Sequence, residues 1–224
     1  MTSEAPSAMR KMVTELCLLD SESWGRYAFG RDPLCGRISM EQKSAWISQA
    51  NECGRAEARE LRAGFGAHTA REYADLLHVR IEEKDSCGAD DYTTFASFQE
   101  PDLITLYRYN VDAAGRLVAE NGLSDLLQSV DIESMLIFHE LFHVVESRDP
   151  AIFTRTAKVV LWKVGPLKNA STLVALSEIA AMAFAQESLS IRYSPYVFDV
   201  LLPWQANPQQ AQKLYHTIMN FRRT

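Results

Sequence analysis

The stretch IESMLIFHELFHVVES, residues 132–147, has the pattern of a helix that carries ionisable side chains in an apolar setting. Asp131 is a good N-cap for this helix, and Glu133 falls in its first turn. Pro150 follows just past the expected end. The apolar residues on either side of the ionisable ones predict that much of the helix is buried. The remainder of the fold is interpreted outward from this helix.

Two histidines of this stretch, His139 and His143, are four residues apart. On a helix such positions lie on one face, one turn apart, so both imidazoles can point at a single ion. Glu140 is rotated by about 100° from His139 and can stand beside the ion, within reach of a water. The alternative is a pair of core histidines, each hydrogen-bonded to a neighbour. A zinc ion is the better explanation in so apolar a helix, because it satisfies both imidazoles at once.

A catalytic zinc ion needs three protein ligands and one position for water. Glu178 is the candidate third ligand, because it is a lone carboxylate in the apolar run ALSEIAAMAFA and glutamate is rarely buried without a partner. An ion pair with Lys163 or Lys168 is the structural alternative. Glu187 lies in a more polar setting and is the weaker candidate. Glu146, three residues after His143, is expected to be an outer group or a surface residue.

The chain before the motif begins with helical patterns. Capping and breaking residues place the boundaries of these helices. We expect loop between the first helix and about residue 40, and a weak point at Gly54 in the second helix. Thr69 is the expected cap of the third. The expected helices are 8–19, 41–62 and a short one from Thr69 to about Leu77.

Strand patterns follow. Alternation and β-forming residues predict strands at 78–84, 93–99 and 103–110, of which LITLYRYN (103–110) is the strongest. The run DSCGADD (85–91) predicts a turn. A short proline-containing link between the last two strands predicts that they are antiparallel neighbours. The segment 111–122 is then expected to be a helix that ends at Gly122.

The second half of the chain is expected to be helical, with further helices around the motif helix. The architecture is therefore predicted to be α+β, with a small antiparallel or mixed sheet followed by a helical half. We expect a helical N-terminal accessory region over 1–65 and a metal-binding domain over 66–224, in one compact unit. The expected later helices are 151–164, a run from Ser171 or Thr172 to Ser190, a short helix within 193–204, and an amphipathic helix over 207–223.

Composition limits the class of protein. The chain has 224 residues, 47% hydrophobic and 23% charged, as in ordinary folded proteins. A net charge of -6 argues against a nucleic-acid-binding surface. We see no secretory signal and no run of about 20 apolar residues that would span a membrane, so a cytoplasmic location is expected. No CxxC pair is present, and the four cysteines are expected to be reduced thiols.

The motif HELFH followed by a downstream glutamate resembles the zincin metallopeptidases, specifically the gluzincin branch, whose third ligand is a glutamate. No HxxGxxH follows, so the signature of the other large branch is absent. The runs TAREYADLLHVRIEEKD (69–85) and FASFQEPDLITLY (95–107) are similar to small bacterial zincin-like proteins. The resemblance covers roughly residues 66–205. It implies a minimal zincin-like fold in which 103–110 is the edge strand over the cleft, where a peptide or protein segment adds as a further strand.

The resemblance also implies roles for individual residues. His139, His143 and Glu178 would bind one Zn2+ per chain, and Glu140 would be the general base that takes a proton from the zinc-bound water. Many gluzincins place an acidic residue four positions after the third ligand. Met182 stands there in this chain. Such enzymes also stabilise the oxyanion with a tyrosine or histidine, and Tyr193 and Tyr196 are the nearest candidates, with ordinary packing as the alternative.

Three functions are compatible with these patterns. The first is a small zinc-dependent peptidase, which an intact Glu140 favours. The second is a zincin-fold protein that binds metal without hydrolysing peptides, as a structural or regulatory module, and Met182 favours it. The third is a di-iron helical bundle, because Glu140 and His143 also form an ExxH element. A di-iron site needs a second ExxH, which the chain lacks, and the strand patterns also disagree with a bundle.

Overall fold

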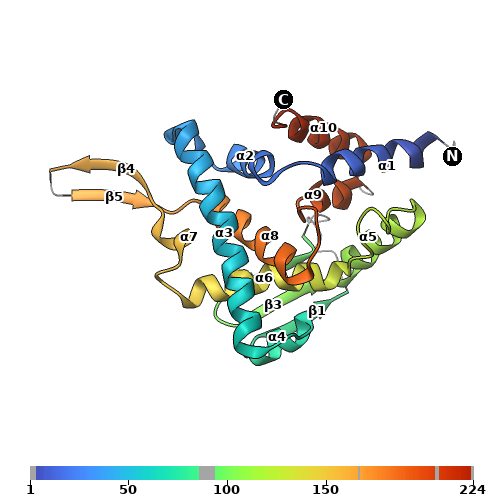
Figure 1. Cartoon of the computed structure of the whole chain (residues 1–224), viewed down its shortest axis with the longest axis horizontal. Helices are drawn as coiled ribbons and strands as arrows, with labels where there is room; N and C mark the ends of the chain where they lie inside the picture. The colour runs from blue at the N-terminus through green and yellow to red at the C-terminus, as the bar shows by residue number, and fades with distance from the viewer. Residues whose placement is uncertain (1–3, 86–93, 166, 205–206, 223–224) are drawn as a thin grey trace.

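The computed structural model describes residues 4–85, 94–165, 167–204 and 207–222, and these residues form an α+β fold (Figure 1). The first five helices are α1 (Glu4–Cys17), α2 (Ser21–Arg31), α3 (Met40–Phe65), α4 (Ala70–Leu76) and α5 (Arg108–Glu120). The later helices are α6 (Ile132–Arg148), α7 (Phe153–Thr156), α8 (Val174–Leu189), α9 (Val197–Leu201) and α10 (Pro208–Met219). Two 3-10 turns are η1 (Cys35–Arg37) and η2 (Leu202–Trp204). The strands are β1 (Arg80–Lys84), β2 (Ala96–Gln99), β3 (Leu103–Tyr107), β4 (Val159–Val164) and β5 (Leu167–Ser171).

A three-stranded mixed sheet has the order β1-β3-β2. Strands β1 and β3 are parallel, with Ile81 opposite Ile104. Strands β2 and β3 are antiparallel, with Phe98 opposite Ile104, so the predicted antiparallel pair is confirmed. The expectation that 103–110 is an edge strand is wrong, because β3 lies between β1 and β2. Three consecutive residues of β3, Ile104, Thr105 and Leu106, are buried, which requires cover on both faces of the strand.

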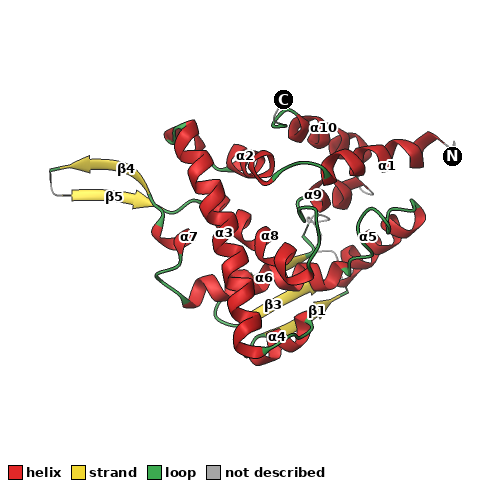
Figure 2. Ribbon diagram, viewed as in Figure 1, coloured by secondary structure: helices red, strands yellow, loops and turns green. Residues whose placement is uncertain are grey.

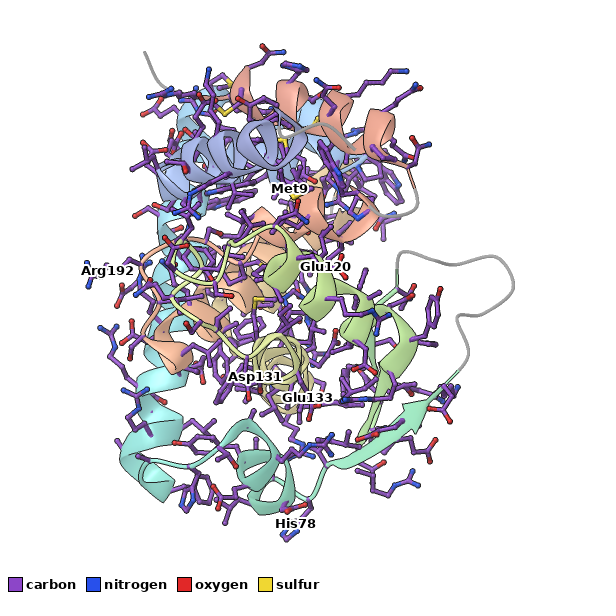
Figure 3. The ribbon with its side chains drawn as sticks, turned by 90° about the vertical axis from the view of Figure 1, so that its right-hand side faces the viewer. Met9, His78, Glu120, Asp131, Glu133 and Arg192 are labelled. Atoms are coloured by element: carbon purple, nitrogen blue, oxygen red, sulfur yellow. The ribbon has the colours of Figure 1, made fainter. Side chains whose placement is uncertain are left out.

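Helix α6 begins and ends where the sequence predicts. The Asp131 side chain accepts a hydrogen bond from the Ser134 backbone N–H (3.1 Å), which caps the helix. Figure 3 shows Asp131 and Glu133 together at this end of the helix. The Glu133 carboxylate is paired with two arginines, Arg71 of α4 and Arg108 of α5. These interactions tie the start of α6 to the elements beside the sheet.

Three helices stack outward from the sheet in the order α6, α8, α3. Helix α6 packs against β2 on one side and α8 on the other, and α8 lies between α6 and α3 (Figures 1 and 2). The α8 surface is small and apolar, with Ala180, Ala181 and Ala183 buried, so its neighbours approach closely. A Cβ added at Gly54 of α3 would lie 2.0 Å from the Ala180 backbone oxygen. Gly54 is therefore the point of closest packing in an uninterrupted helix, and the predicted weak point is absent.

Two of the expected segments are wrong. Residues 21–31, expected to be loop, form helix α2, whose cap is the Asp20 side chain (2.7 Å from the Ser23 N–H). Burial of Trp24 against α3 and the C-terminal helices outweighs the turn-forming residues nearby. Residues 151–164, expected to be one helix, form α7 and β4, because the β-branched and aromatic run favours a strand once β5 pairs with it.

Other boundaries follow the sequence with small shifts. The Thr69 cap of α4 is confirmed, and it forms a reciprocal capping box with Glu72. The strand pattern at 103–110 is shorter than expected, because Arg108 already begins α5. Three of the four cysteines lie in the described part of the chain, and Cys17, Cys35 and Cys53 are free thiols. The turn predicted at 85–91 lies outside the described residues except for Asp85. Within the described residues, no helix is both long and apolar enough to cross a membrane.

Candidate metal centre

Side chains from α6 and α8 meet at one point. The Nε2 atoms of His139 and His143 are 3.3 Å apart. Glu178 Oε2 lies 3.5 Å from His139 Nε2, and the other oxygen of the same carboxylate, Oε1, lies 3.7 Å from His143 Nε2. One ligand atom from each residue can be chosen so that all lie within 4.8 Å of one another. The three residues that the sequence singled out as ligands are therefore brought together by the packing of α6 on α8.

The distances fit a single ion. Around a tetrahedral ion with bonds of about 2.0–2.1 Å, neighbouring ligand atoms are about 3.3–3.4 Å apart. The two imidazole nitrogens, 3.3 Å apart, are at this edge length, and the Glu178 carboxylate has one oxygen near each of them, Oε2 at 3.5 Å from His139 and Oε1 at 3.7 Å from His143. Two imidazoles and one carboxylate are good ligands for a divalent metal, and they leave one position for water or substrate. The group can hold a metal ion without rearrangement of the backbone.

A second set of contacts orients His143. Ser177 Oγ lies 2.6 Å from Glu146 Oε2 and donates its proton to that carboxylate. Ser177 Oγ also lies 3.1 Å from His143 Nδ1. Because the hydroxyl proton is already donated to Glu146, this oxygen must accept a hydrogen bond from the Nδ1–H. This network assigns the proton of the neutral imidazole to Nδ1 and leaves the Nε2 lone pair free for a metal ion. Glu146 is partly buried and lies behind His143, in the position of an outer partner of the candidate ligand.

The electrostatics of the triad are those of a strongly coupled group. Burial alone would lower the pKa of His139, but its hydrogen bond to Glu178 and the charge of that carboxylate outweigh burial and raise the pKa to about 9. Burial would raise the pKa of Glu178, but the hydrogen bond to His139 and the charges of both imidazoles lower it to about 2. Without metal, the triad therefore holds a charged His139–Glu178 pair.

Glu140 lies next to the histidines but is not part of the triad. Its side chain is buried, with 7% of the residue exposed. Burial raises the pKa of its carboxyl group. The charges of His139 and His143 and a hydrogen bond from the Phe98 backbone N–H act in the opposite direction and lower this pKa. The hydrogen bond from Phe98 fixes the carboxylate against the edge of β2. A carboxylate with a raised pKa beside a metal site can accept and return a proton.

The triad lines a cleft of about 1230 Å³. One wall is the edge strand β2 with the residues just before it, from Thr94 to Phe98, and the facing wall comes from α2, α8 and α9. The outer edge of β2 therefore borders the cleft, where the sequence predicted 103–110. The side chains that surround the metal position in this cleft include His139, Glu140, His143, Glu146, Ser177 and Glu178.

An ion pair between α2 and α9 lines the cleft beside the triad. Arg31 Nη1 lies 2.8 Å from Asp199 Oδ2, and the Tyr27 hydroxyl donates to the same oxygen at 2.9 Å. Burial raises the pKa of Asp199, while Arg31 and Tyr27 lower it. The charge of Asp199 also acts on His139, whose protonated form it favours. Asp199, on α9, thus provides negative charge near His139. In gluzincins an acid four residues after the third ligand often does this, and Met182 occupies that position here.

Asp32 holds the helix that carries Glu178. Helix α8 has no side-chain cap of its own. The buried Asp32 carboxylate accepts a hydrogen bond from the Ala175 N–H in the first turn of α8 (3.1 Å) and another from the Leu34 N–H (2.8 Å). A carboxylate at a helix N-terminus satisfies free N–H groups and interacts favourably with the helix dipole. Residues directly after α2 therefore fix the start of α8.

The two tyrosines proposed for the oxyanion have different positions. Tyr193 does not line the cleft, and its hydroxyl donates to the Leu127 carbonyl oxygen (3.0 Å), so it is removed from the candidates. Tyr196 lines the cleft and stacks on Trp24, with ring centroids 5.6 Å apart. Its hydroxyl is buried and has no hydrogen-bond partner among the described residues. Burial raises the pKa of this hydroxyl well above its ordinary value, and the negative charges of Glu178 and Asp199 raise it further.

Sequence reasoning missed three residues of the site. Ser177 was overlooked although it directly precedes Glu178, and Asp199 although it is a lone acid in the apolar run VFDVLL, the same signal that identified Glu178. Arg31 could not be found, because the segment that carries it was expected to be loop. The weaker ligand candidate, Glu187, is outside the triad and does not line the cleft.

Comparison with known proteins finds no match: no family model fits the sequence, no curated protein is similar to it, and no solved structure resembles the fold.

Proposed function

We propose that this chain is a zinc-dependent hydrolase of the zincin type, gluzincin-like in its ligands, that cleaves peptide bonds. The observation that supports the proposal most is the convergence of His139, His143 and Glu178, whose ligand atoms lie within 4.8 Å of one another, with Glu140 beside them. The ligands and Glu140 lie in an open cleft, whereas a purely structural zinc site is usually closed by four protein ligands.

The residues around the metal position divide the chemistry between them. A bound zinc ion would act as a Lewis acid, lowering the pKa of a water to about 7 and polarising a carbonyl group. Glu140, with its raised pKa, takes up the proton of the attacking water and passes it to the leaving amine. Ser177 and Glu146 keep the His143 ring in the orientation and tautomer that a ligand needs.

The geometry of the cleft supports a peptide or a flexible protein segment as the substrate. Strand β2 is an edge strand of its sheet, and the cleft is lined by its first residues together with the two residues before it, over 94–98. An extended peptide that pairs with this edge would add a strand to the sheet and pass over the metal position. Main-chain hydrogen bonds of this kind align a peptide largely independently of its side chains.

Metal content tests the proposal directly. We expect about one zinc ion per chain in the wild-type protein after incubation with zinc and removal of the excess. We expect much less in His143→Ala and Glu178→Ala, and wild-type content in the matched control Glu187→Ala, whose carboxylate is outside the triad. Elemental analysis of the purified proteins measures this. A wild-type protein that binds no zinc would overturn the proposal.

Activity tests the role of Glu140. Glu140→Gln is close to isosteric and leaves the three ligands in place, so zinc content should not change. Cleavage of a random peptide library should be abolished in this variant, because the amide cannot accept the proton. Cleavage that survives the substitution at the wild-type rate would contradict the assignment of Glu140 as the base.

A metal-binding module without peptidase activity is the second candidate. Two observations favour it: Met182 stands where gluzincins often have an acid, and the Tyr196 hydroxyl is buried, although the residue lines the cleft. On this alternative, zinc content follows the same pattern as above but no peptide of the library is cleaved by the wild-type protein. The library screen therefore separates the two functions.

A further inference from the structure

Strands β4 and β5 form an arm that stands away from the rest of the molecule. They pair only with each other among the described strands, and Figures 1 and 2 show the hairpin projecting beyond α7 and the N-terminal end of α8. An isolated two-stranded hairpin is marginally stable in water. The arm also exposes large apolar side chains: 50% of Trp162, 69% of Val164 and 65% of Leu167. Such a surface is typical of an interaction site.

The register of the hairpin separates two chemically different faces. Cross-strand partners share a face, and a bulge between Val160 and Trp162 changes the alternation of β4. On one face, Trp162 pairs with Asn169, and Val164 pairs with Leu167, so this face is mainly apolar. On the other face, Lys163 lies directly opposite Lys168, and Val160 pairs with Ala170 nearer the base of the arm. The outer part of the arm is therefore mainly apolar on one side and basic on the other.

The lysine pair indicates the charge of the missing partner. Like charges directly opposite each other destabilise a strand pair. The hairpin sequence VVLWKVGPLKNAS has these two lysines and no acidic residue, in a chain whose net charge is -6. An anionic group between the two ammonium groups would relieve the repulsion. Acidic side chains are the complementary partner for this face.

A second copy of the chain fits the arm poorly. Both strands of the arm are edge strands, so in principle either could pair with the arm of another molecule. Such pairing would bring four lysines together on one face. Lysine on edge strands is a common device against self-association of this kind. An acidic strand, in contrast, would neutralise the same lysines.

The arm is continuous with the cleft. Lys158, directly before β4, and Thr172, directly after β5, both line the cleft that contains the triad. Lys158 is exposed, and it places a positive charge at this junction in addition to those of Lys163 and Lys168 on the arm. A polypeptide segment bound along the arm would therefore have its neighbouring residues at the entrance of the cleft.

We propose that the β4–β5 arm binds an extended polypeptide segment of alternating acidic and apolar residues, which adds to the hairpin as a third strand. Alternation matters because successive side chains of a strand point to opposite faces. The apolar residues of the segment cover Trp162, Val164 and Leu167, and its acidic residues meet Lys163 and Lys168. That the segment belongs to a substrate of the cleft rests on the proposed hydrolase function; binding to the arm does not.

Fluorescence anisotropy with the full-length protein tests the proposal. The probes are two fluorescein-labelled peptides, one of alternating glutamate and valine and one of alternating lysine and valine. The solution contains a metal chelator, so neither zinc binding nor hydrolysis affects the result, and low salt, so screening is weak. The variants are the double reversal K163E/K168E, the apolar-face variant Trp162→Thr, and the control K11E/K213E, which makes the same charge change at exposed lysines of α1 and α10.

We expect the wild-type protein and the control to bind the glutamate peptide at least about tenfold more tightly than the lysine peptide. The double reversal should invert that preference, and Trp162→Thr should weaken binding of the glutamate peptide severalfold. Equal affinity for both peptides, a preference that the reversal leaves unchanged, or no saturable binding up to millimolar concentration would overturn the proposal. Because the assay excludes metal, failure of the hydrolase function alone would leave a positive binding result intact.

Discussion

At the scale of single residues, the proton on His143 Nδ1 is the feature that would leave Nε2 of this histidine free to bind a metal ion. The Ser177 hydroxyl oxygen accepts a hydrogen bond from this N–H, and the hydroxyl donates a hydrogen bond to the Glu146 carboxylate. If this chain of hydrogen bonds sets the orientation of the ring, removing it should weaken metal binding without removing a ligand.

We therefore expect Ser177→Ala and Glu146→Gln each to weaken zinc binding by about 10- to 100-fold, the range typical of partners of metal-ligating histidines. Competition with a chromophoric chelator measures the affinity. The control is Ser188→Ala, on the same helix but outside the cleft, which should bind zinc like the wild type. Unchanged affinity in both outer variants would show that the packing of α6 alone orients His143.

The His139–Glu178 pair predicts how the stability of the metal-free protein depends on pH. The pKa of His139 is raised from 6.5 to about 9, so its stabilisation is fully present below about pH 6.5 and is lost as the pH rises through 9. The pKa of Glu178 is lowered from 4.5 to about 2, so its stabilisation is present above 4.5 and is lost as the pH falls through 2.

Urea unfolding in the presence of a chelator should therefore show a fall of roughly 2–3 kcal/mol between pH 6.5 and pH 9.5. The variant His139→Asn should lose most of this dependence. A wild-type protein whose free energy of unfolding does not fall over this interval would contradict the charged pair.

At the scale of the elements, the approach of α3 to α8 depends on Gly54. A Cβ there would overlap the Ala180 backbone, whereas Gly64 in the last turns of the same helix has no atom within 4 Å of an added Cβ. We expect Gly54→Ala to lower the free energy of unfolding by about 3 kcal/mol or more, because backbone cannot yield as a side chain can. Gly64→Ala should instead be neutral or stabilise by up to about 1 kcal/mol, because alanine favours the helix. Chemical denaturation of both variants measures the difference.

The elements also show which local patterns carry structural information. Helix α6 has its cap, its first-turn acid and its apolar residues within one short stretch, so both of its ends could be predicted. Helix α2 and the β4–β5 arm could not. The buried residues of α2 face other helices, and the strands of the arm exist because each pairs with the other. Non-local contacts decide such segments, and local propensity is only a weak guide.

At the scale of the whole molecule, the first 65 residues are packed into the structure that supports the site. Helix α3 covers α8, and Asp32 holds the N-terminal end of α8. The N-terminal helices also share an apolar cluster with α9, which carries Asp199. Residues 1–65 therefore supply a structural layer that packs on α8, the helix that carries Glu178.

We expect removal of residues 1–65 to leave an insoluble or unfolded chain, because the apolar surface of α8 would be exposed. Gel filtration and far-UV circular dichroism of the truncated protein check this. Replacing the outer part of the arm, residues 160–170, by a short glycine-serine turn is the control, since that deletion keeps the buried Val159 and should leave the fold intact. A folded truncated protein that hydrolyses peptides faster than the full chain would show that the segment is a cover.

The sequence by itself determined the helix at 132–148, the pair of histidines on one of its faces with Glu140 beside them, the candidate third ligand Glu178, and the α+β class. These features depend on spacing along one element, which helix geometry converts directly into spatial proximity. Only the tertiary structure decided that Glu178 meets the histidines, that β2 rather than β3 borders the cleft, and that Ser177, Asp199 and Arg31 surround the site. Their positions depend on the packing of α8 against α6 and α3, which brings together residues that are far apart in the chain.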